Sequence, residues 1–185
     1  MTVVPISYRR AHIEWKLRKN GGGFVADHGA DASVLSACTK DSDGRDINAD
    51  GNQIVATAEY FVYVVDGETG AYTPAVISMS STQLKKARRW NTLINTFMIP
   101  HPQTGESFNP AIFSRTYHLK TIPESNDYGS WFGWDIRPGD LLSEVVGGPA
   151  IYAAARDFRA KVAAGEVKAA PDVAEGGDQD DDSPM

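Results

Sequence analysis

Alternating apolar and polar positions predict strands near the start of the chain. Residues 11–18 place apolar side chains at every odd position and polar ones at every even position, which is the period of a half-buried strand. Three glycines at 21–23 end this pattern, and residues 24–28 and 34–39 are suited to two further short strands. We expect the even positions of the first strand to lie away from the core and Trp15 to lie in it.

The longest apolar run predicts a central strand and a hairpin. Residues 53–65 are rich in β-branched and aromatic side chains, and their even positions form a continuous apolar face. Asp66 and Gly67 have the composition of a hairpin turn, and residues 72–79 predict the returning strand.

A helical period follows this hairpin. Residues 81–98 repeat apolar side chains every three or four positions after Ser80, a residue suited to cap a helix. Lys85, Arg88 and Arg89 lie together on the polar side of this helix.

Two more strands and a second helix complete the pattern. Strands are predicted at 113–122 and 130–137, and a helix with an apolar stripe begins at Pro149. Five strands with a helix between the third and the fourth are in the order of an OB-fold barrel. We therefore expect a mainly β protein with a five-stranded OB-fold nucleic-acid-binding domain at 1–146, a C-terminal helix at 147–168 and a disordered acidic tail at 169–185.

The net charge of the chain resides in its last fifteen residues. Residues 171–185 hold six carboxylates and no basic side chain, whereas residues 1–170 hold eighteen acidic and eighteen basic side chains. Such a segment buries too little apolar surface to offset its ordering entropy, so we expect disorder there. Since binding depends on the local field of a patch, the bulk acidity does not exclude nucleic acid.

The composition excludes several classes of protein. A single cysteine, Cys38, rules out an internal disulfide and a cysteine-based zinc cluster. No apolar run approaches the roughly 20 residues that span a bilayer, and the first residues do not have the pattern of a signal peptide. We expect a soluble, cytoplasmic protein.

Catalytic and metal-binding signals are weak. The four histidines are scattered, and the chain contains none of the common phosphate-loop, hydrolase or zinc-protease motifs. Residues 46–51 match the first half of an EF-hand calcium loop, but Thr57 stands where the loop needs Glu. Asp27, Glu59 and Asp135 could converge on a metal only by chance. We expect no enzyme, no cofactor and no metal, and an ordinary Asp/Asn/Gly loop at 46–51.

Basic and aromatic side chains outside the predicted core faces suggest a different chemistry. Flat rings beside cations bind single-stranded nucleic acid, because bases stack on the rings while Lys and Arg contact phosphates. The candidate DNA-binding residues are Arg10, Lys16, Arg18, Phe61, Tyr63, Lys85, Arg88, Arg89, Lys120 and Trp131. Trp134 is expected in the core instead.

The chain also resembles a known group. The stretches VISMSSTQLKKARRWNTLI and YHLKT…GSWFGWDIR, together with the tail, are similar to bacteriophage single-stranded DNA-binding proteins, which are OB-folds with an acidic C-terminal tail. The tip of the tail, with Asp180, Asp181, Asp182, Pro184 and Met185, resembles the terminus with which bacterial single-stranded DNA-binding proteins dock on replication and repair proteins. Those proteins usually end in Phe where this chain has Met185. In that group the helix between strands three and four often closes the barrel away from the DNA groove, which weakens the case for Lys85, Arg88 and Arg89.

These observations predict sequence-independent binding and protection of single-stranded DNA in phage replication and recombination. The tail would compete with DNA for the basic groove and recruit partner proteins, and the protein could form a homodimer. Two alternatives stay open: a non-enzymatic interaction or virion assembly protein whose tail serves solubility, and a DNA-processing nuclease.

Overall fold

The described residues form two compact units. The computed structural model describes residues 1–127, 129–167 and 169. Residues 1–11 and 56–169 make up one unit, called here the sheet unit, and residues 12–55 make up the other, called the insert unit. The last helix belongs to the sheet unit.

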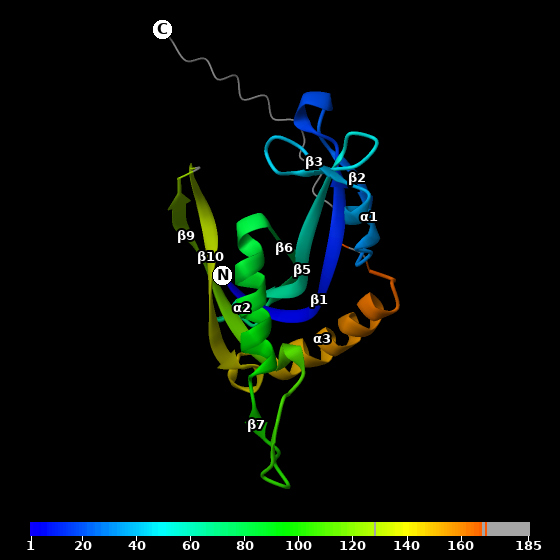
Figure 1. The fold of residues 1–185 in the computed structure, drawn as a ribbon. Coiled ribbons are helices and arrows are strands. Elements are labelled where there is room, and N and C mark those ends of the chain that lie inside the picture. Colours follow the sequence, from blue (N-terminus) through cyan, green and yellow to red (C-terminus); the bar gives the residue numbers. More distant parts are fainter. Residues whose placement is uncertain (128, 168, 170–185) are drawn as a thin grey trace. The chain divides into compact units, whose positions relative to one another are not determined.

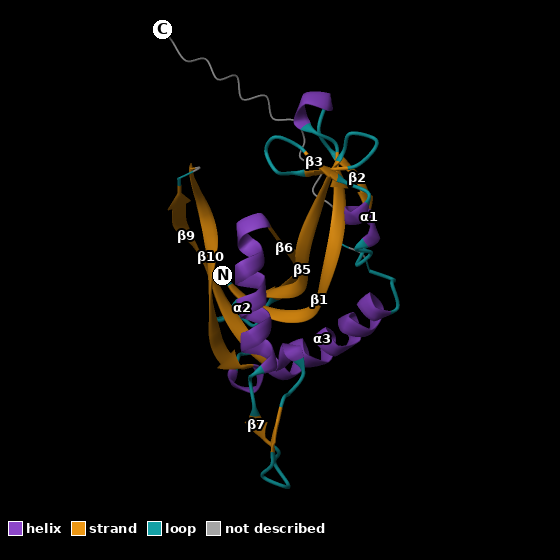
Figure 2. Ribbon diagram, viewed as in Figure 1, coloured by secondary structure: helices purple, strands orange, loops and turns teal. Residues whose placement is uncertain are grey.

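The protein is mainly β, as the sequence predicts. In the sheet unit the strand order is β10-β9-β1-β5, and β6 pairs with the other side of β5. The sheet curls into a half-barrel (Figures 1 and 2). The bounds of these strands are β1 Thr2–Trp15, β5 Gln53–Val65, β6 Tyr72–Ser80, β9 Arg115–Asn126 and β10 Gly129–Leu141.

Helix α2 (Leu84–Asn95) lies in the opening of the half-barrel, where it packs against both β6 and β10. Its Trp90 ring is fully buried and stacks on Tyr60 of β5 with 4.1 Å between the ring centroids. The Tyr60 hydroxyl donates to the carbonyl of Ala87 at 2.8 Å, and burial raises the pKa of this phenol well above its usual range. The even, apolar face predicted for β5 is therefore confirmed as a core face.

Helix α3 (Gly148–Ala163) covers the opposite face of the same strand. Its apolar stripe includes Ile151 and Ala155, which are both fully buried, and Phe158, whose ring lies 5.6 Å from that of Tyr63. β5 is thus buried on both faces, because each of the two amphipathic helices shields one of them.

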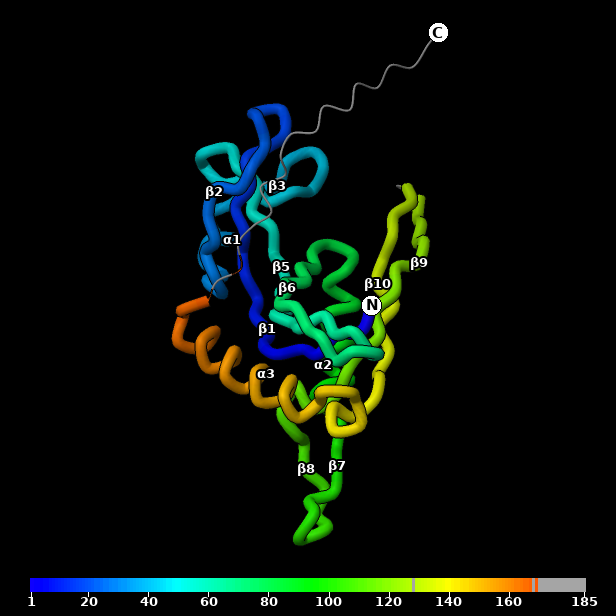
Figure 3. Tube along the Cα trace, turned by 180° about the vertical axis from the view of Figure 1, so that it is seen from behind, coloured from blue at the N-terminus to red at the C-terminus, as the bar shows by residue number. Residues whose placement is uncertain are grey.

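A short hairpin that the sequence did not predict lies beyond the end of α2 (Figure 3). It consists of β7 (Ile99–Pro100) and β8 (Ser107–Phe108). The Asn109 side-chain amide donates to the carbonyls of Ile94 and Phe97 at 3.0 and 2.7 Å. These bonds satisfy carbonyls at the end of the helix and fix the start of the hairpin.

The insert unit is built from the distal ends of β1 and β5 and from short elements between them. β2 (Phe24–Asp27) pairs with β1, and β3 (Thr39–Lys40) pairs with β4 (Asp46–Ile47), which in turn pairs with β5. The strand predicted at 34–39 is wrong, since residues 33–36 form the one-turn helix α1 (Ser33–Ser36). The Asp31 carboxylate accepts the Ser33 amide at 2.9 Å and so favours the start of a helical turn.

Two residues on the even side of β1, His12 and Glu14, are buried, contrary to the expectation, whereas Arg10, Lys16 and Arg18 are exposed. His12 and Glu14 are each about 6 % exposed. The Glu14 carboxylate accepts from Asn48 at 2.9 Å and from Asn52 at 2.7 Å, and contacts His28 Nε2 at 2.7 Å. Hydrogen bonds from Asn48, Asn52 and His28 therefore take the place of water around the Glu14 carboxylate.

Candidate nucleic-acid interface

Two of the predicted stacking residues are core residues. Phe61 is 2 % exposed and Tyr63 is 6 % exposed. Both rings pack against Phe158 of α3, at centroid distances of 6.4 and 5.6 Å. The assignment of these two residues to an exposed stacking surface is therefore corrected: the helix that follows the sheet returns to cover them.

An exposed aromatic side chain, Phe132, lies instead on the β9–β10 hairpin. One face of this hairpin begins in the core with Leu119 and Ile136 and continues outward with Trp134 and then Phe132. Trp134 is half-buried, whereas Phe132 is 72 % exposed. Trp134, expected in the core, is partly buried and packs against the core cluster. Phe132 was not recognised as a candidate. Their shared face follows from strand alternation, which puts positions 132, 134 and 136 on one side.

Trp131 lies on the other face of the hairpin. Its indole Nε1 donates to Glu124 Oε2 at 3.0 Å, and Lys86 of α2 forms an ion pair with the same carboxylate. The hydrogen bonds from Lys86 and Trp131 lower the pKa of Glu124 and outweigh its desolvation. The ring of Trp131 is half-buried in this arrangement.

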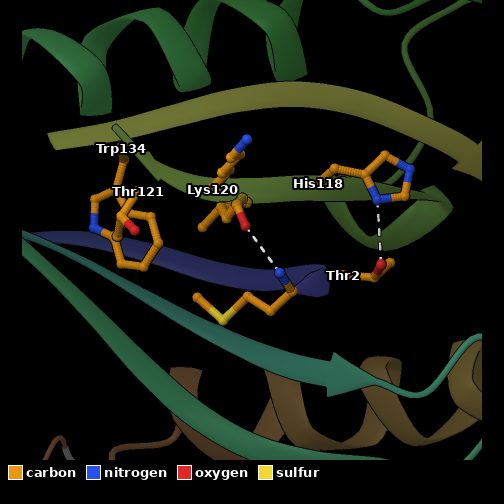
Figure 4. A pocket seen from close by; sticks show the side chains of 7 residues that line it. Thr2, His118, Lys120, Thr121 and Trp134 are labelled. Carbon is orange, nitrogen blue, oxygen red and sulfur yellow. Dashed lines mark hydrogen bonds between the residues drawn. The ribbon is translucent and has the colours of Figure 1, made fainter. Parts of the chain in front are cut away.

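A shallow cavity of about 510 Å³ opens beside Trp134 (Figure 4). It is lined by Trp134 and Thr121 from the hairpin and by the start of β1. Lys120 also borders it, but its side chain leaves β9 on the side opposite the Trp134 ring (Figure 4). Near the other end of the cavity, His118 Nδ1 lies 3.2 Å from Thr2 Oγ1. The cavity thus combines an aromatic wall with polar groups of the strand edge.

The predicted basic residues are exposed, but they fall in different parts of the molecule. Lys120 lies on β9, Arg10 on β1, and Lys85, Arg88 and Arg89 on the outer side of α2. Among the described residues, Lys120, Arg10, Lys85 and Arg89 form no ion pair, while Arg88 Nε donates to the Leu84 carbonyl at 3.3 Å. The helix is amphipathic as predicted, with Ala87, Trp90 and Ile94 buried.

The insert unit holds a second basic and aromatic cluster. Lys16 and Arg18 are exposed at the end of β1, where residues 18–20 form a 3-10 turn. Trp15 is half-buried, not a core residue, and its ring meets that of Phe24 edge to face at 5.9 Å. Phe24 was missed because its strand is short and lacks a clear alternating pattern.

Nothing in the described part of the chain brings metal ligands together. Residues 1–127, 129–167 and 169 contain no group of three or more His, Cys, Asp or Glu side chains that could hold a metal ion. Glu59 pairs with Arg9 at 2.5 Å and Asp135 with Arg137 at 2.8 Å. In the loop at 46–51, the Asn48 side chain accepts the amides of Asp50 and Asn52, which makes this segment an ordered turn.

Asp180, Asp181, Asp182, Pro184 and Met185 lie outside the described residues. None of the helices that are described is long and apolar enough to cross a membrane.

Comparisons with known proteins identify the family of the chain. Residues 1–168 match the family model of the Pam3 phage gp34-like protein. Separate comparisons with curated proteins and with solved structures found no match. Since the match covers most of the sequence, the chain belongs to the Pam3 phage gp34-like family and is a phage protein.

Proposed function

We propose that this phage protein binds single-stranded DNA without sequence preference and protects it during replication and recombination. The observation that carries the proposal is the β9–β10 hairpin, which exposes Phe132 and part of Trp134 on one face. Lys120, a cation without an ion pair among the described residues, lies on the same hairpin. Bases stack on such rings for about 1–3 kcal/mol each regardless of identity, and Lys contacts the phosphates.

The strand order supports an OB-type barrel for this function. The five long strands run in sheet order β6-β5-β1-β9-β10, and α2 lies between the third and the fourth of them in the sequence. OB barrels bind oligonucleotides with the loop between strands one and two and the loop between strands four and five. The corresponding segments here are the insert unit and the β9–β10 hairpin.

The insert unit supports the same function by its own side chains. Trp15 and Phe24 supply aromatic surface, and Lys16, Arg18 and Lys19 supply positive charge next to them in the sequence. Lys and Arg at such positions displace counterions from a single strand, so affinity should fall with salt by a slope of about 0.7 per phosphate contact. In this proposal the exposed cations of α2 and Arg10 add only to the general attraction.

Fluorescence titration tests the proposal. Purified protein is titrated with oligo(dT) and with a duplex of equal length at two salt concentrations, with tryptophan emission as the signal. We expect quenching, a preference for the single strand and a marked loss of affinity at high salt. Phe132→Ala should weaken binding about tenfold, whereas Phe108→Ala, which removes an exposed ring from the β7–β8 hairpin, should not.

The acidic tail is proposed to recruit replication and recombination proteins and to compete with DNA for basic surface. This part rests on the sequence alone, because residues 171–185 hold six carboxylates against a neutral body. A pull-down with the full chain and with a chain ending at residue 170 tests recruitment.

A second candidate function is that of a non-enzymatic interaction or assembly protein. It is favoured by an apolar groove of about 450 Å³ between α3 and the β7–β8 hairpin, lined by Phe108, Leu142 and Tyr152 among others. Absence of binding to any oligonucleotide, together with stable association with another phage protein, would favour this candidate. Degradation of the oligonucleotide in the presence of metal would favour a nuclease.

A further inference from the structure

The open edge of β9 offers a donor and an acceptor beside the Trp134 ring. The Leu119 amide donates to the Met1 carbonyl, and the Met1 nitrogen donates to the Leu119 carbonyl, both at 2.9 Å. The backbone groups of Leu119 therefore point away from β10. Because these groups alternate along a strand, those of Thr121 and Pro123 point the same way.

The partner strand gives the same result. Thr121 is opposite Trp134, and the Trp134 amide donates to the Gln83 side chain at 3.1 Å rather than to β9. Thr121 and Trp134 thus form a pair without mutual hydrogen bonds, whose side chains lie close together. Among the described residues, none bonds to the Thr121 amide and carbonyl on the open side.

Proline occupies the next position on this edge. Pro123 has no N–H to present, so the edge cannot extend as a continuous ladder for an added strand. Next to the cavity of about 510 Å³, Thr121 therefore offers the one donor with a neighbouring acceptor, while Pro123 adds only a carbonyl. This favours a small planar ligand over a peptide strand.

We propose that the Trp134 cavity holds one unpaired nucleobase of the bound single-stranded DNA, stacked on the indole and hydrogen-bonded by its Watson–Crick edge to the Thr121 backbone. Each of the four bases carries a donor next to an acceptor on that edge, such as N3–H and O4 of thymine. The Thr121 N–H and carbonyl can therefore bind any unpaired base, whichever of the four it is. In a duplex the same edge is occupied by the complementary base.

The inference rests on the proposed function, and modified oligonucleotides separate the two. The first ligand is oligo(dT), and the second is the same oligomer with a methyl group on N3 of every thymine, which keeps the phosphates and the stacking surface but removes the N3–H donor. The intact protein should bind the methylated oligomer about fivefold more weakly. Equal binding of both overturns the cavity proposal and leaves single-strand binding intact. Binding of neither overturns the proposed function itself.

Thr121→Pro removes the amide donor without removing a bond to β10, and Pro123 shows that this strand accommodates proline on the same edge. This variant should bind oligo(dT) about fivefold more weakly than the intact protein does. Methylation of the oligomer should reduce the affinity of the variant by less than it reduces that of the intact protein. Ser125→Pro places a proline on the same edge nearer the tip and should bind both oligomers as the intact protein does. Additive effects of Thr121→Pro and methylation would contradict the proposal.

Trp134→Leu supplies a second variant if Thr121→Pro does not fold by circular dichroism. It should weaken binding of oligo(dT) about tenfold and leave binding of an abasic oligomer of equal length unchanged, since the abasic strand has nothing to stack. An equal loss for both oligomers would show that Trp134 acts through the fold and would overturn the proposal.

Discussion

Glu14 is a nearly buried carboxylate whose two oxygens are both hydrogen-bonded. Asn48 and Asn52 donate to one oxygen, and His28 Nε2 contacts the other at 2.7 Å. Burial alone raises the pKa of Glu14, but the bonds from Asn52, His28 and Asn48 outweigh it and hold this pKa below the usual 4.5. The charged form is therefore favoured by folding, and its contribution is present above about pH 4.5 and lost as the pH falls through the lowered pKa.

Glu14→Gln should destabilise the protein in a pH-dependent manner. Near pH 7 the loss in free energy of unfolding should be about 1–3 kcal/mol, because the charged acceptor of several bonds is removed. The difference from the intact protein should shrink as the pH falls below 4.5 and through the lowered pKa of Glu14, where the natural carboxylate becomes protonated. Urea unfolding at several pH values measures it, with Glu68→Gln, a substitution at an exposed turn residue, as the control. A difference that stays constant with pH would contradict the assigned role.

Substitution of Phe61 and of Phe132 should have opposite effects on stability and on DNA affinity. Phe61 is 2 % exposed under α3, so Phe61→Ala should lower the free energy of unfolding by about 3–5 kcal/mol and leave the DNA affinity of the folded protein unchanged. Phe132 is 72 % exposed, so Phe132→Ala should change stability by less than about 0.5 kcal/mol and weaken DNA binding. Urea unfolding and oligo(dT) titration of both variants provide the comparison. Loss of affinity in a fully folded Phe61→Ala protein would restore this residue to the interface.

At the scale of elements, local pattern predicted the long strands and helices, but not what covers them. The central strand is observed at Gln53–Val65, as predicted, and the basic helix and the last helix are present. The odd face of that strand was misjudged because its cover, α3, comes more than eighty residues later in the sequence. The sequence shows both the apolar odd residues of this strand and the apolar stripe of the last helix. Each of these apolar surfaces has to pack against another one to leave solvent.

The positions of Trp131 and Trp134 could not be told from spacing alone. Alternation places Trp134 on the same face as Phe132 and Trp131 on the other face. Which part of a face extends beyond the core depends on where the neighbouring strand ends. β1 pairs with β9 only near residues 117–119, so the hairpin face beyond that point has no strand beside it. The start of β1 at Thr2 was missed, since the expected strand began at residue 11.

One carboxylate, that of Glu124, links the β9–β10 hairpin to α2 in addition to their packing. Glu124 accepts from Lys86 of α2 and from Trp131, and a Cβ on Gly133 would overlap Glu124 Oε2 and lie 3.0 Å from Gln83 Nε2. Glycine at 133 therefore leaves the space that this carboxylate occupies. The hairpin that carries Phe132 and Trp134 is thus joined to α2 through the Glu124 side chain as well as through the Gln83 bond to Trp134.

Gly133→Ala should push the Glu124 side chain away and break its bonds to Lys86 and Trp131. We expect a lower urea midpoint and altered tryptophan emission. In a Glu124→Ala background, the same glycine substitution should lower the urea midpoint much less, because the overlapping carboxylate oxygen has already been removed. Gly67→Ala, at a turn position where a Cβ meets nothing within 4 Å, is the matched control. Equal costs of Gly133→Ala in both backgrounds would show that the backbone, not the carboxylate, requires glycine.

For the whole molecule, charge is divided between a neutral body and an acidic terminus. Eighteen acidic and eighteen basic side chains balance over residues 1–170, and residues 171–185 supply the net charge of −6. Several carboxylates of the body are engaged in ion pairs, including Asp41 and Asp43 with Arg45 and Asp46 with Lys40. The unpaired cations of the hairpin, α2 and β1 are therefore open to an anion, whether it is a phosphate or a carboxylate.

Removal of residues 171–185 should tighten binding of single-stranded DNA, most strongly at low salt. In the proposed competition the tail is a linked polyanion that would meet the same cations as the phosphates, and competition between charges weakens as salt screens them over a Debye length of about 10 Å at 0.1 M. Titration of oligo(dT) with the full and the shortened chain at two salt concentrations measures the effect. A full-length chain with its six tail carboxylates changed to amides separates charge from length, and it should bind like the shortened chain. If both variants bind as the natural protein does at low salt, the tail does not compete with DNA, and recruitment of partner proteins is left as its proposed role.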